Sequence, residues 1–271
     1  MLTLLPTPIG NIADITFRTI QTLENTQLIL CEDTRVTKQL LNILKDRYNL
    51  ELANVDIISF HEHNGKERLK QVATRLKKEN VVYMSDAGMP VISDPGQLLV
   101  EYCQENSIEY DVLPGASVAP LIYAASGFKS GKFYFYGFLP QKGALRSQEL
   151  RKIMQNGLDT IIYEAPHRIL KLIEQICQID EDREIFCTKE LTKKYQKYYK
   201  KRAIELLDKL KNDSLKGEWA LVIEAKKYNE ATLNLLDIKE IDIPPKAKAK
   251  LLAKLTNKSV KECYEELKTK R

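Results

Sequence analysis

The chain has 271 residues, of which 44% are hydrophobic and 29% charged, and its net charge at neutral pH is +5. This composition supplies enough apolar side chains for a core, so it excludes a disordered or fibrous protein. No apolar run approaches the roughly 18 residues that cross a bilayer, and the opening residues carry no basic segment, so we expect neither a membrane span nor a secretory signal peptide.

The first half of the chain alternates short apolar runs with amphipathic stretches. This alternation is typical of a parallel sheet with helices on both faces. The runs LILC at 28–31 and VVYM at 81–84 suit strands that are buried on both faces. In chain order we predict strands at 2–5, 27–31, 56–59, 81–85 and 109–113, and helices at 14–23, 34–44, 67–78, 96–105 and 117–126.

Glycine and proline interrupt the periodicity at 127–143, and a second α/β series follows. Its predicted strands are 133–136, 160–163, 184–187 and 219–224, and its predicted helices are 145–155, 167–177 and 203–210. Two Lys-rich helices, at 247–255 and 259–267, follow the pair Pro244-Pro245. We therefore expect an N-terminal α/β domain at 1–126, a C-terminal α/β domain at 127–240 and a basic helical tail at 241–271.

Positive charge is concentrated late in the chain. Residues 189–216 hold 10 basic and 4 acidic side chains, and residues 244–271 hold 9 and 3, so each segment is net +6 and the remainder is acidic. This distribution favours a polyanionic partner, nucleic acid first, although solvated Lys-rich helices have the same composition. The stretch KKYQKYYKKR, with Tyr195, Tyr198 and Tyr199, is interpreted as a flexible basic segment that offers phosphate contacts and stacking rings, or as an exposed loop without a partner.

The cysteine pattern bears on the compartment. The five cysteines are scattered, odd in number and never spaced as C-x-x-C. We therefore expect reduced thiols in a cytoplasmic protein, with neither a disulfide framework nor a zinc site.

Ligands of open α/β sheets bind beyond the carboxyl ends of the strands. The fingerprints G-x-G-x-x-G, GKS/T and G-x-S-x-G are all absent, which argues against a dinucleotide site, a P-loop and a hydrolase triad. The loop 85–96 is long and rich in Asp, Gly and Pro, so Asp86 is a candidate acceptor for a ligand hydroxyl or amine and Gly88 allows close approach of the main chain. Ser117 can cap a helix, or its main chain can bind an adenine edge.

Two of the three histidines, His61 and His63, flank Glu62 after the third predicted strand. No further Cys or His is available to complete a metal site, so we expect none. Glu32, Asp33 and Arg35 follow the second strand. Acidic and basic side chains at adjacent strand ends predict a polar substrate face.

A series of motifs resembles the ribosomal RNA small-subunit methyltransferase I family of the tetrapyrrole-methylase superfamily. The motifs, in this order, are PTPIGNIADIT, LILCEDTRVTKQLL, SFHEHN, SDAGMPVISDPG, PGASVAP, FYGFLP, EAPHR and GEWALVIEA. The resemblance covers roughly the whole chain. It implies two α/β domains of tetrapyrrole-methylase type with S-adenosylmethionine in the inter-domain cleft. It also implies 2′-O-methylation of a cytidine ribose in the decoding region of 16S rRNA, usually by a homodimer.

The same resemblance suggests roles for individual residues. The donor site should be lined by Pro8, Asp86, Gly88, Val91, Ser117, Val118, Ala165 and Ala220. The nucleotide should be faced by Glu32, Asp33, Arg35, His61, Glu62 and Asn64. As a hypothesis of our own about the mechanism, Arg35, Arg168 and Lys193 are candidate phosphate clamps. We expect His61 or Glu62 to be the base that takes the ribose hydroxyl proton. The chain departs from the family pattern at Tyr195 and Gln196, where an acidic residue or His is usual, and at Gln141, where LPRK becomes LPQK.

Two other functions remain open. A relative that methylates a ring carbon of a tetrapyrrole would share the donor cleft but would not need a Lys-rich appendage. A non-catalytic RNA-binding protein built on the same fold would not bind the donor.

Overall fold

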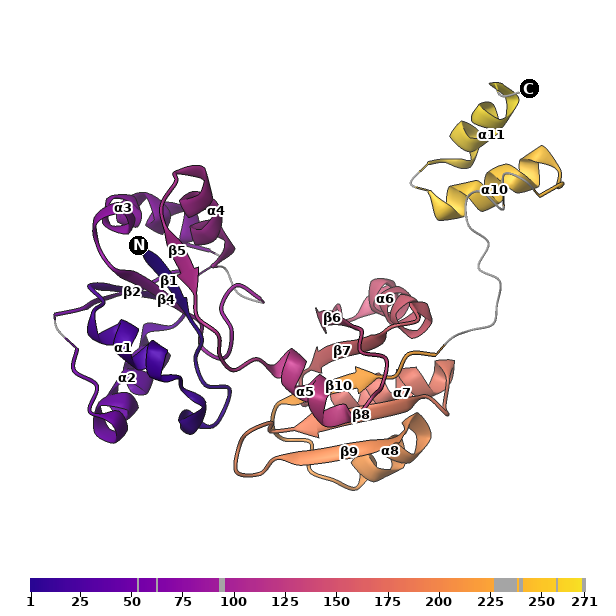
Figure 1. The fold of residues 1–271 in the computed structure, drawn as a ribbon. Helices are drawn as coiled ribbons and strands as arrows, with labels where there is room; N and C mark the ends of the chain where they lie inside the picture. Colours follow the sequence, from indigo (N-terminus) through magenta and orange to yellow (C-terminus); the bar gives the residue numbers. More distant parts are fainter. Residues whose placement is uncertain are drawn as a thin grey trace. The chain divides into compact units, whose positions relative to one another are not determined.

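The computed structural model describes residues 1–52, 54–61, 63–92, 96–226, 238, 241–256 and 258–269. The chain divides into two compact units, Met1–Lys226 and Lys227–Arg271. The first unit contains two five-stranded sheets with helices packed on them, so the predicted α/β class is confirmed (Figure 1). None of the described helices is both long enough and apolar enough to cross a bilayer.

The first sheet is entirely parallel and has the strand order β3-β2-β4-β1-β5. Its strands are β1 (Leu2–Leu5), β2 (Leu28–Cys31), β3 (Asp56–Ser59), β4 (Val81–Met84) and β5 (Tyr110–Val112). Every residue of β1, β2 and β4 is buried, as the apolar runs predict. Because these strands are parallel, the loops that follow them leave the same edge of the sheet.

Helices cover both faces of this sheet (Figure 1). On one face lie α1 (Phe17–Glu24) and α2 (Thr34–Tyr48), and on the other lie α3 (Gly65–Lys78) and α4 (Gln97–Glu105). Leu23 and Leu44 pack on the first face, and Leu76 and Leu99 pack on the second. All four side chains are fully buried, so each helix contributes its apolar stripe to a separate core layer.

The predicted helix at 14–23 is wrong at its beginning. A short 3-10 turn, η1 (Ile12–Asp14), comes first, and α1 begins only after Thr16. The Thr16 hydroxyl accepts the Thr19 N–H at 3.1 Å, which caps α1 and fixes its first residue at Phe17. The helix predicted at 34–44 continues for one further turn to Tyr48 and ends at Asn49, whose backbone is left-handed.

The second sheet is mixed and has the strand order β6-β7-β10-β8-β9. Its strands are β6 (Phe133–Phe138), β7 (Asp159–Glu164), β8 (Glu184–Lys189), β9 (Lys197–Arg202) and β10 (Trp219–Ile223). Only β6 and β7 pair in parallel. On one face pack α6 (Gly143–Gln155), α7 (Ile169–Ile179) and α8 (Ala203–Lys211), and on the other packs α5 (Val118–Ser126).

The interpretation of KKYQKYYKKR as a flexible segment is wrong, because residues 197–202 form strand β9, paired with β8. Tyr199 is buried, its ring stacks on Trp219 at a centroid distance of 6.0 Å, and its hydroxyl donates to Asp213 at 2.8 Å. Both flanks of β9 are charged, so the sequence lacks the apolar alternation that predicts a half-buried strand.

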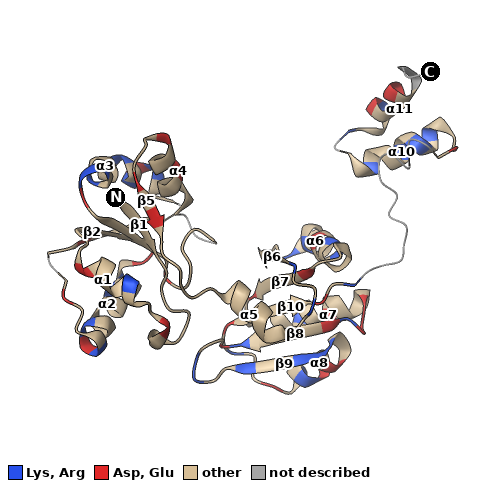
Figure 2. Ribbon diagram, viewed as in Figure 1, with Lys and Arg blue, Asp and Glu red and all other residues tan. Residues whose placement is uncertain are grey.

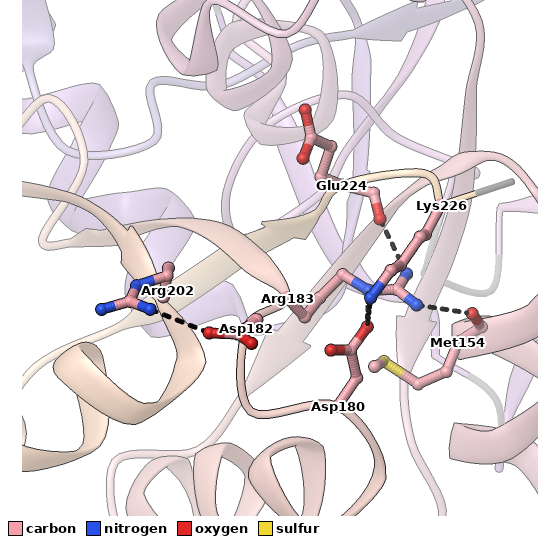
Figure 3. A network of polar contacts seen from close by, with 7 residues as sticks. All are labelled: Met154, Asp180, Asp182, Arg183, Arg202, Glu224 and Lys226. Atoms are coloured by element: carbon pink, nitrogen blue, oxygen red, sulfur yellow. Dashed lines mark hydrogen bonds and ion pairs between the residues drawn. The ribbon is translucent and has the colours of Figure 1, made fainter.

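A buried arginine fixes the end of the first unit (Figure 3). Arg183 pairs with Asp180 at 3.1 Å, and its guanidinium donates to the carbonyl oxygens of Met154 and Glu224 at 3.1 and 2.9 Å. Lys226 reaches the same Asp180 carboxylate at 2.8 Å. These contacts tie the residues just beyond β10 to α6 and α7.

The second unit is a helix pair, α10 (Pro245–Leu255) and α11 (Val260–Thr269), which confirms the two helices predicted after Pro244. Ala249, Leu252 and Cys263 form its small core together with Ile238. The Ser259 hydroxyl accepts the Glu262 N–H and the Glu262 carboxylate accepts the Ser259 N–H at 2.7 Å, a capping box that begins α11.

Candidate functional site

The first unit contains a cavity of about 540 Å³, a volume typical of small-molecule sites. Its lining comes from the connections of both sheets. The first sheet and the start of α5 contribute Ile9, Glu32, Asp86, Ala87, Gly88, Met89, Ile92, Ser117 and Val118. The second sheet and its loops contribute Phe138, Tyr163, Glu164, Ala165, Pro166, Thr188, Leu191, Glu218, Trp219 and Ala220.

The loop after β1 is fastened to the loop after β4. Thr7 and Gly88 exchange two main-chain hydrogen bonds of 3.0 and 3.1 Å. The Thr7 hydroxyl donates to the Ser85 carbonyl at 3.2 Å, and the Ser85 hydroxyl donates to the Gly88 carbonyl at 3.0 Å. Since the Thr7 and Ser85 side chains are buried, the bonds are shielded from water and hold one wall of the cavity in place.

Two glycines allow this close approach. Gly88 has φ +86°, and a Cβ there would lie 3.1 Å from Ile9 Cγ2. A Cβ at Gly115 would lie only 2.2 Å from Pro6 Cγ. Any side chain at Gly115 would therefore displace the turn that leads to Ser117.

Carboxylates from two adjacent strand ends meet at the cavity. The Asp86 N–H donates to Glu32 Oε1 at 3.1 Å, and Asp86 Oδ1 accepts the Asp33 N–H at 3.1 Å. Partial burial raises the pKa of Asp86, and the nearby charge of Asp33 adds to this, while the Asp33 N–H opposes it. The pair places negative charge against the cavity, which suits a cationic ligand.

Glu164, at the end of β7, also lines the cavity and is almost completely buried. Its Oε2 accepts from Arg146 at 2.7 Å, and its Oε1 accepts from Arg168 at 2.6 Å and from the Ala165 N–H at 2.9 Å. Arg146 also donates to Gln175 and to the Pro140 carbonyl. The carboxylate is thus fully engaged, and it fixes the turn that carries Ala165.

The β8–β9 hairpin supplies a third wall. Leu191 lines the cavity, and Lys193 pairs with Glu190 at 3.2 Å and with Glu218 at 2.9 Å. The pKa of Glu190 is lowered, mainly by the hydrogen bond from the Glu218 N–H and also by Lys193. Burial of Lys193 acts to lower its pKa, but the two carboxylates outweigh this effect and raise it. Gly10 packs directly against this hairpin. A Cβ at position 10 would lie only 2.5 Å from Lys193 Cγ, so a larger residue would displace the lysine side chain.

Most of the residues expected at the donor site line this cavity. These residues are Asp86, Gly88, Ser117, Val118, Ala165 and Ala220. Ser117 occupies the N-cap position of α5 without a side-chain capping bond. Pro8 and Val91 are not among the lining residues. Val91 packs against the core beneath α4 and has φ +73°, a strained conformation for a β-branched residue.

The residues expected to face the nucleotide are more dispersed. Of the nucleotide-facing set, Glu32 lines the cavity. Asp33 caps α2 by accepting the Arg35 N–H and pairs with the Arg35 guanidinium at 2.6 Å, contacts that lower the pKa of Asp33 to about 2. Arg168 forms an ion pair with Glu164. Lys193 forms ion pairs with Glu190 and Glu218.

The expected base His61 lies beyond β3, the edge strand of the first sheet. Asn64 Oδ1 accepts the His61 N–H at 2.9 Å, and Asn64 Nδ2 lies 3.0 Å from His61 Nε2. An amide N–H donated to Nε2 would leave the proton of the neutral ring on Nδ1. The alternative base, Glu62, lies outside the described residues.

Several lining residues were not assigned from the sequence, although they lie in or next to quoted motifs. Phe138 belongs to FYGFLP and Trp219 to GEWALVIEA, and Tyr163 directly precedes EAPHR. Burial raises the pKa of Tyr163 to about 12, so it is a neutral phenol at physiological pH. Across the described part of the chain, no group of three or more His, Cys, Asp or Glu side chains could hold a metal ion.

Comparisons with known proteins agree with this architecture. The family model for Tetrapyrrole (Corrin/Porphyrin) Methylases matches residues 1–207. A ribosomal RNA small subunit methyltransferase I of Campylobacter fetus is 44% identical, with 99% of this chain and 100% of the relative covered. Its counterpart from Helicobacter pylori strain J99 is 40% identical, with 97% and 96% covered.

Among solved structures, a diphthine synthase shares the fold with a TM-score of 0.61 at 13% identity, covering 84% of this chain and 91% of the other. The chain belongs to the ribosomal RNA small subunit methyltransferase I family of tetrapyrrole methylases.

Proposed function

We propose that the protein transfers a methyl group from S-adenosylmethionine to the 2′-hydroxyl of a cytidine ribose in 16S rRNA of the small ribosomal subunit. The observation that carries the proposal is the cavity built from both sheets, in a chain whose curated relatives at about 40% identity are named for rRNA methylation. We further propose that the enzyme acts as a homodimer in the cytoplasm.

The lining residues fit a cationic nucleoside donor. Val118, Leu191 and Ala220 give an apolar wall, while Asp86 and Glu32 supply negative charge for a sulfonium or ammonium group. Gly88 lines the cavity, and its backbone packs closely against Ile9, because a Cβ there would lie 3.1 Å from Ile9 Cγ2. When bound, the donor supplies an electrophilic methyl group.

The chain's own residues then have two tasks. The fastened loops around Thr7 and Gly88 hold the reactants in a fixed geometry, and orientation of this kind contributes about 7–11 kcal/mol in favourable cases. A base that removes the ribose proton adds roughly 10²–10⁴-fold. We propose His61 for this role, with Glu62 as the alternative. To act as the base, His61 must release its contact with Asn64 Nδ2, so that Nε2 can accept the ribose proton.

Figure 2 marks the positions of the Lys and Arg residues along the ribbon, including those of β9 and α10. The two basic segments differ in how many of their charges form ion pairs. On β9, Lys197 and Lys200 pair with Asp213 and Glu184, and Arg202 pairs with Asp182 and Glu205, so much of this charge is neutralised locally. On α10, three exposed lysines are spaced four residues apart and therefore share one helix face. These are Lys246, Lys250 and Lys254. We propose that α10 anchors rRNA through its phosphates.

Mass mapping of 2′-O-methyl groups tests the proposal. Small subunits from cells that lack the enzyme are incubated with donor and purified protein, and the 16S rRNA is digested. The expected result is one new 2′-O-methylcytidine. Methylation of a corrin precursor in a parallel incubation, with none of the rRNA, would favour the tetrapyrrole alternative. Failure to bind the donor would favour a non-catalytic RNA-binding protein.

A further inference from the structure

The lining of the cavity has an enclosed part and an open part. Thr188, Leu191, Trp219 and Ala220 are all buried and form the interior wall. By contrast, two large apolar side chains of the lining stand in solvent, Phe138 at 58% exposure and Ile92 at 56%. A small donor fits against the enclosed wall, whereas a polymer must approach from the exposed side.

A β-bulge determines where Phe138 points. The pairing of β6 with β7 shifts register between Phe135 and Gly137, and Gly137 has φ +79°. In a regular strand the side chains at 135 and 138 would point to opposite faces. The extra residue returns Phe138 to the face of Phe135, and both rings contact Tyr163, at centroid distances of 5.0 and 5.5 Å.

The surroundings hold this exposed ring firmly. Phe138 pairs in register with Tyr163 and packs against it edge to face, with an interplanar angle of 73°. Its neighbours Gly137 and Leu139 are buried. The Pro140 carbonyl accepts from the buried Arg146, which anchors the chain just beyond the strand. The ring of Phe138 is therefore exposed at the mouth of the cavity and held in one orientation by the bulge, by Tyr163 and by the anchored chain on either side.

We propose that Phe138 stacks on the unpaired base of the nucleotide whose ribose is methylated, and that Ile92 contacts the same base from the other side of the mouth. The assignment rests on the proposed function and deepens it. Every base has a π-face, and stacking on an aromatic side chain is the usual way in which a protein holds a base that has left its helix. The ring thus orients the nucleotide while the donor occupies the enclosed part.

The test measures methyl transfer from labelled donor to small subunits that lack the modification, together with S-adenosylhomocysteine binding by calorimetry. Phe138→Ala and Phe138→Leu remove the ring, and Phe138→Leu keeps apolar volume in case the alanine variant fails to fold. Phe138→Tyr keeps the ring. Phe17→Ala is the matched control, since Phe17 is 85% exposed on α1 and is not a lining residue.

Loss of one stacked base should raise KM for the subunit about 5- to 100-fold in Phe138→Ala and Phe138→Leu, with S-adenosylhomocysteine affinity unchanged. Phe17→Ala should stay within twofold of the unaltered enzyme, and Phe138→Tyr, which keeps the ring, should have a KM well below that of Phe138→Leu. The assignment is overturned if Phe138→Leu keeps the original KM, or if donor affinity falls by the same factor, since the ring would then serve the donor. Absence of transfer by the unaltered enzyme would refute the proposed function itself, and this assignment with it.

Discussion

The buried ion pair of Glu164 and Arg146 offers a stringent test of how the second wall of the cavity is built. Their side chains are 1% and 2% exposed. Glu164→Gln keeps the shape but removes the charge that two arginines and the Ala165 N–H share. Breaking a buried pair from one side costs about 3–5 kcal/mol, because the remaining charge is left uncompensated. That is a large fraction of the roughly 5–15 kcal/mol that stabilises a typical domain.

Urea unfolding followed by tryptophan fluorescence measures this cost. The single tryptophan, Trp219, lies in β10 and reports on the second sheet. With a urea slope near 3 kcal/mol per M, the midpoint should fall by about 1 M or more. Adding Arg146→Met should cost less than the sum of the two single changes, because the stranded cation is removed together with its partner.

A matched control uses an exposed pair in the same part of the molecule. Glu205→Gln breaks the contact with Arg202, whose side chain is 54% exposed, and should leave the midpoint unchanged. If Glu164→Gln also leaves it unchanged, the inference that this carboxylate holds the Ala165 turn is wrong.

Three further predictions address the first sheet and α10. Gly115→Ala should lower stability by about 1–3 kcal/mol in thermal unfolding and weaken S-adenosylhomocysteine binding, since its Cβ would overlap Pro6; an unchanged melting temperature would contradict the close packing. The Arg35 contact lowers the pKa of Asp33 to about 2, so the stability that Asp33 adds is present above its ordinary value of 3.8 and is lost as the pH falls towards 2. Asp33→Asn should therefore lose less stability over that interval in an acid titration followed by circular dichroism, and an identical acid profile would count against the contact. Replacing Lys246, Lys250 and Lys254 by alanine should weaken RNA binding and make log K against log salt shallower by about 2, whereas an unaltered slope would show that these charges only solvate α10.

The sequence predicted the first sheet well, for a physical reason. Strands buried on both faces are short apolar runs, and β2 and β4 have this pattern. Strand β9 was missed because it lies at the edge of its sheet and buries only Tyr199 among lysines and arginines. Its pairing with β8 is a long-range contact that local periodicity does not record.

The candidate site was also predicted only in part, and again the residues that were missed depend on long-range pairing. Asp86, Gly88 and Ser117 were identified because loops at the carboxyl ends of parallel strands converge, and all three line the cavity. Thr188, Leu191 and Glu218 were not identified, since an antiparallel arrangement of β10 and β8 brings them together. Val91 belongs to a quoted motif, yet its strained backbone directs it into the core, which residue identity alone does not indicate.

The most direct test of the account is a crystal of the protein soaked with S-adenosylhomocysteine. We predict density for the nucleoside in the cavity, in contact with Asp86, Ser117, Ala165 and Ala220, with the sulfur directed towards the open side where Phe138 stands. Density at another place on the molecule, or a cavity that stays empty at saturating ligand, would contradict the central claim that this cavity holds the methyl donor.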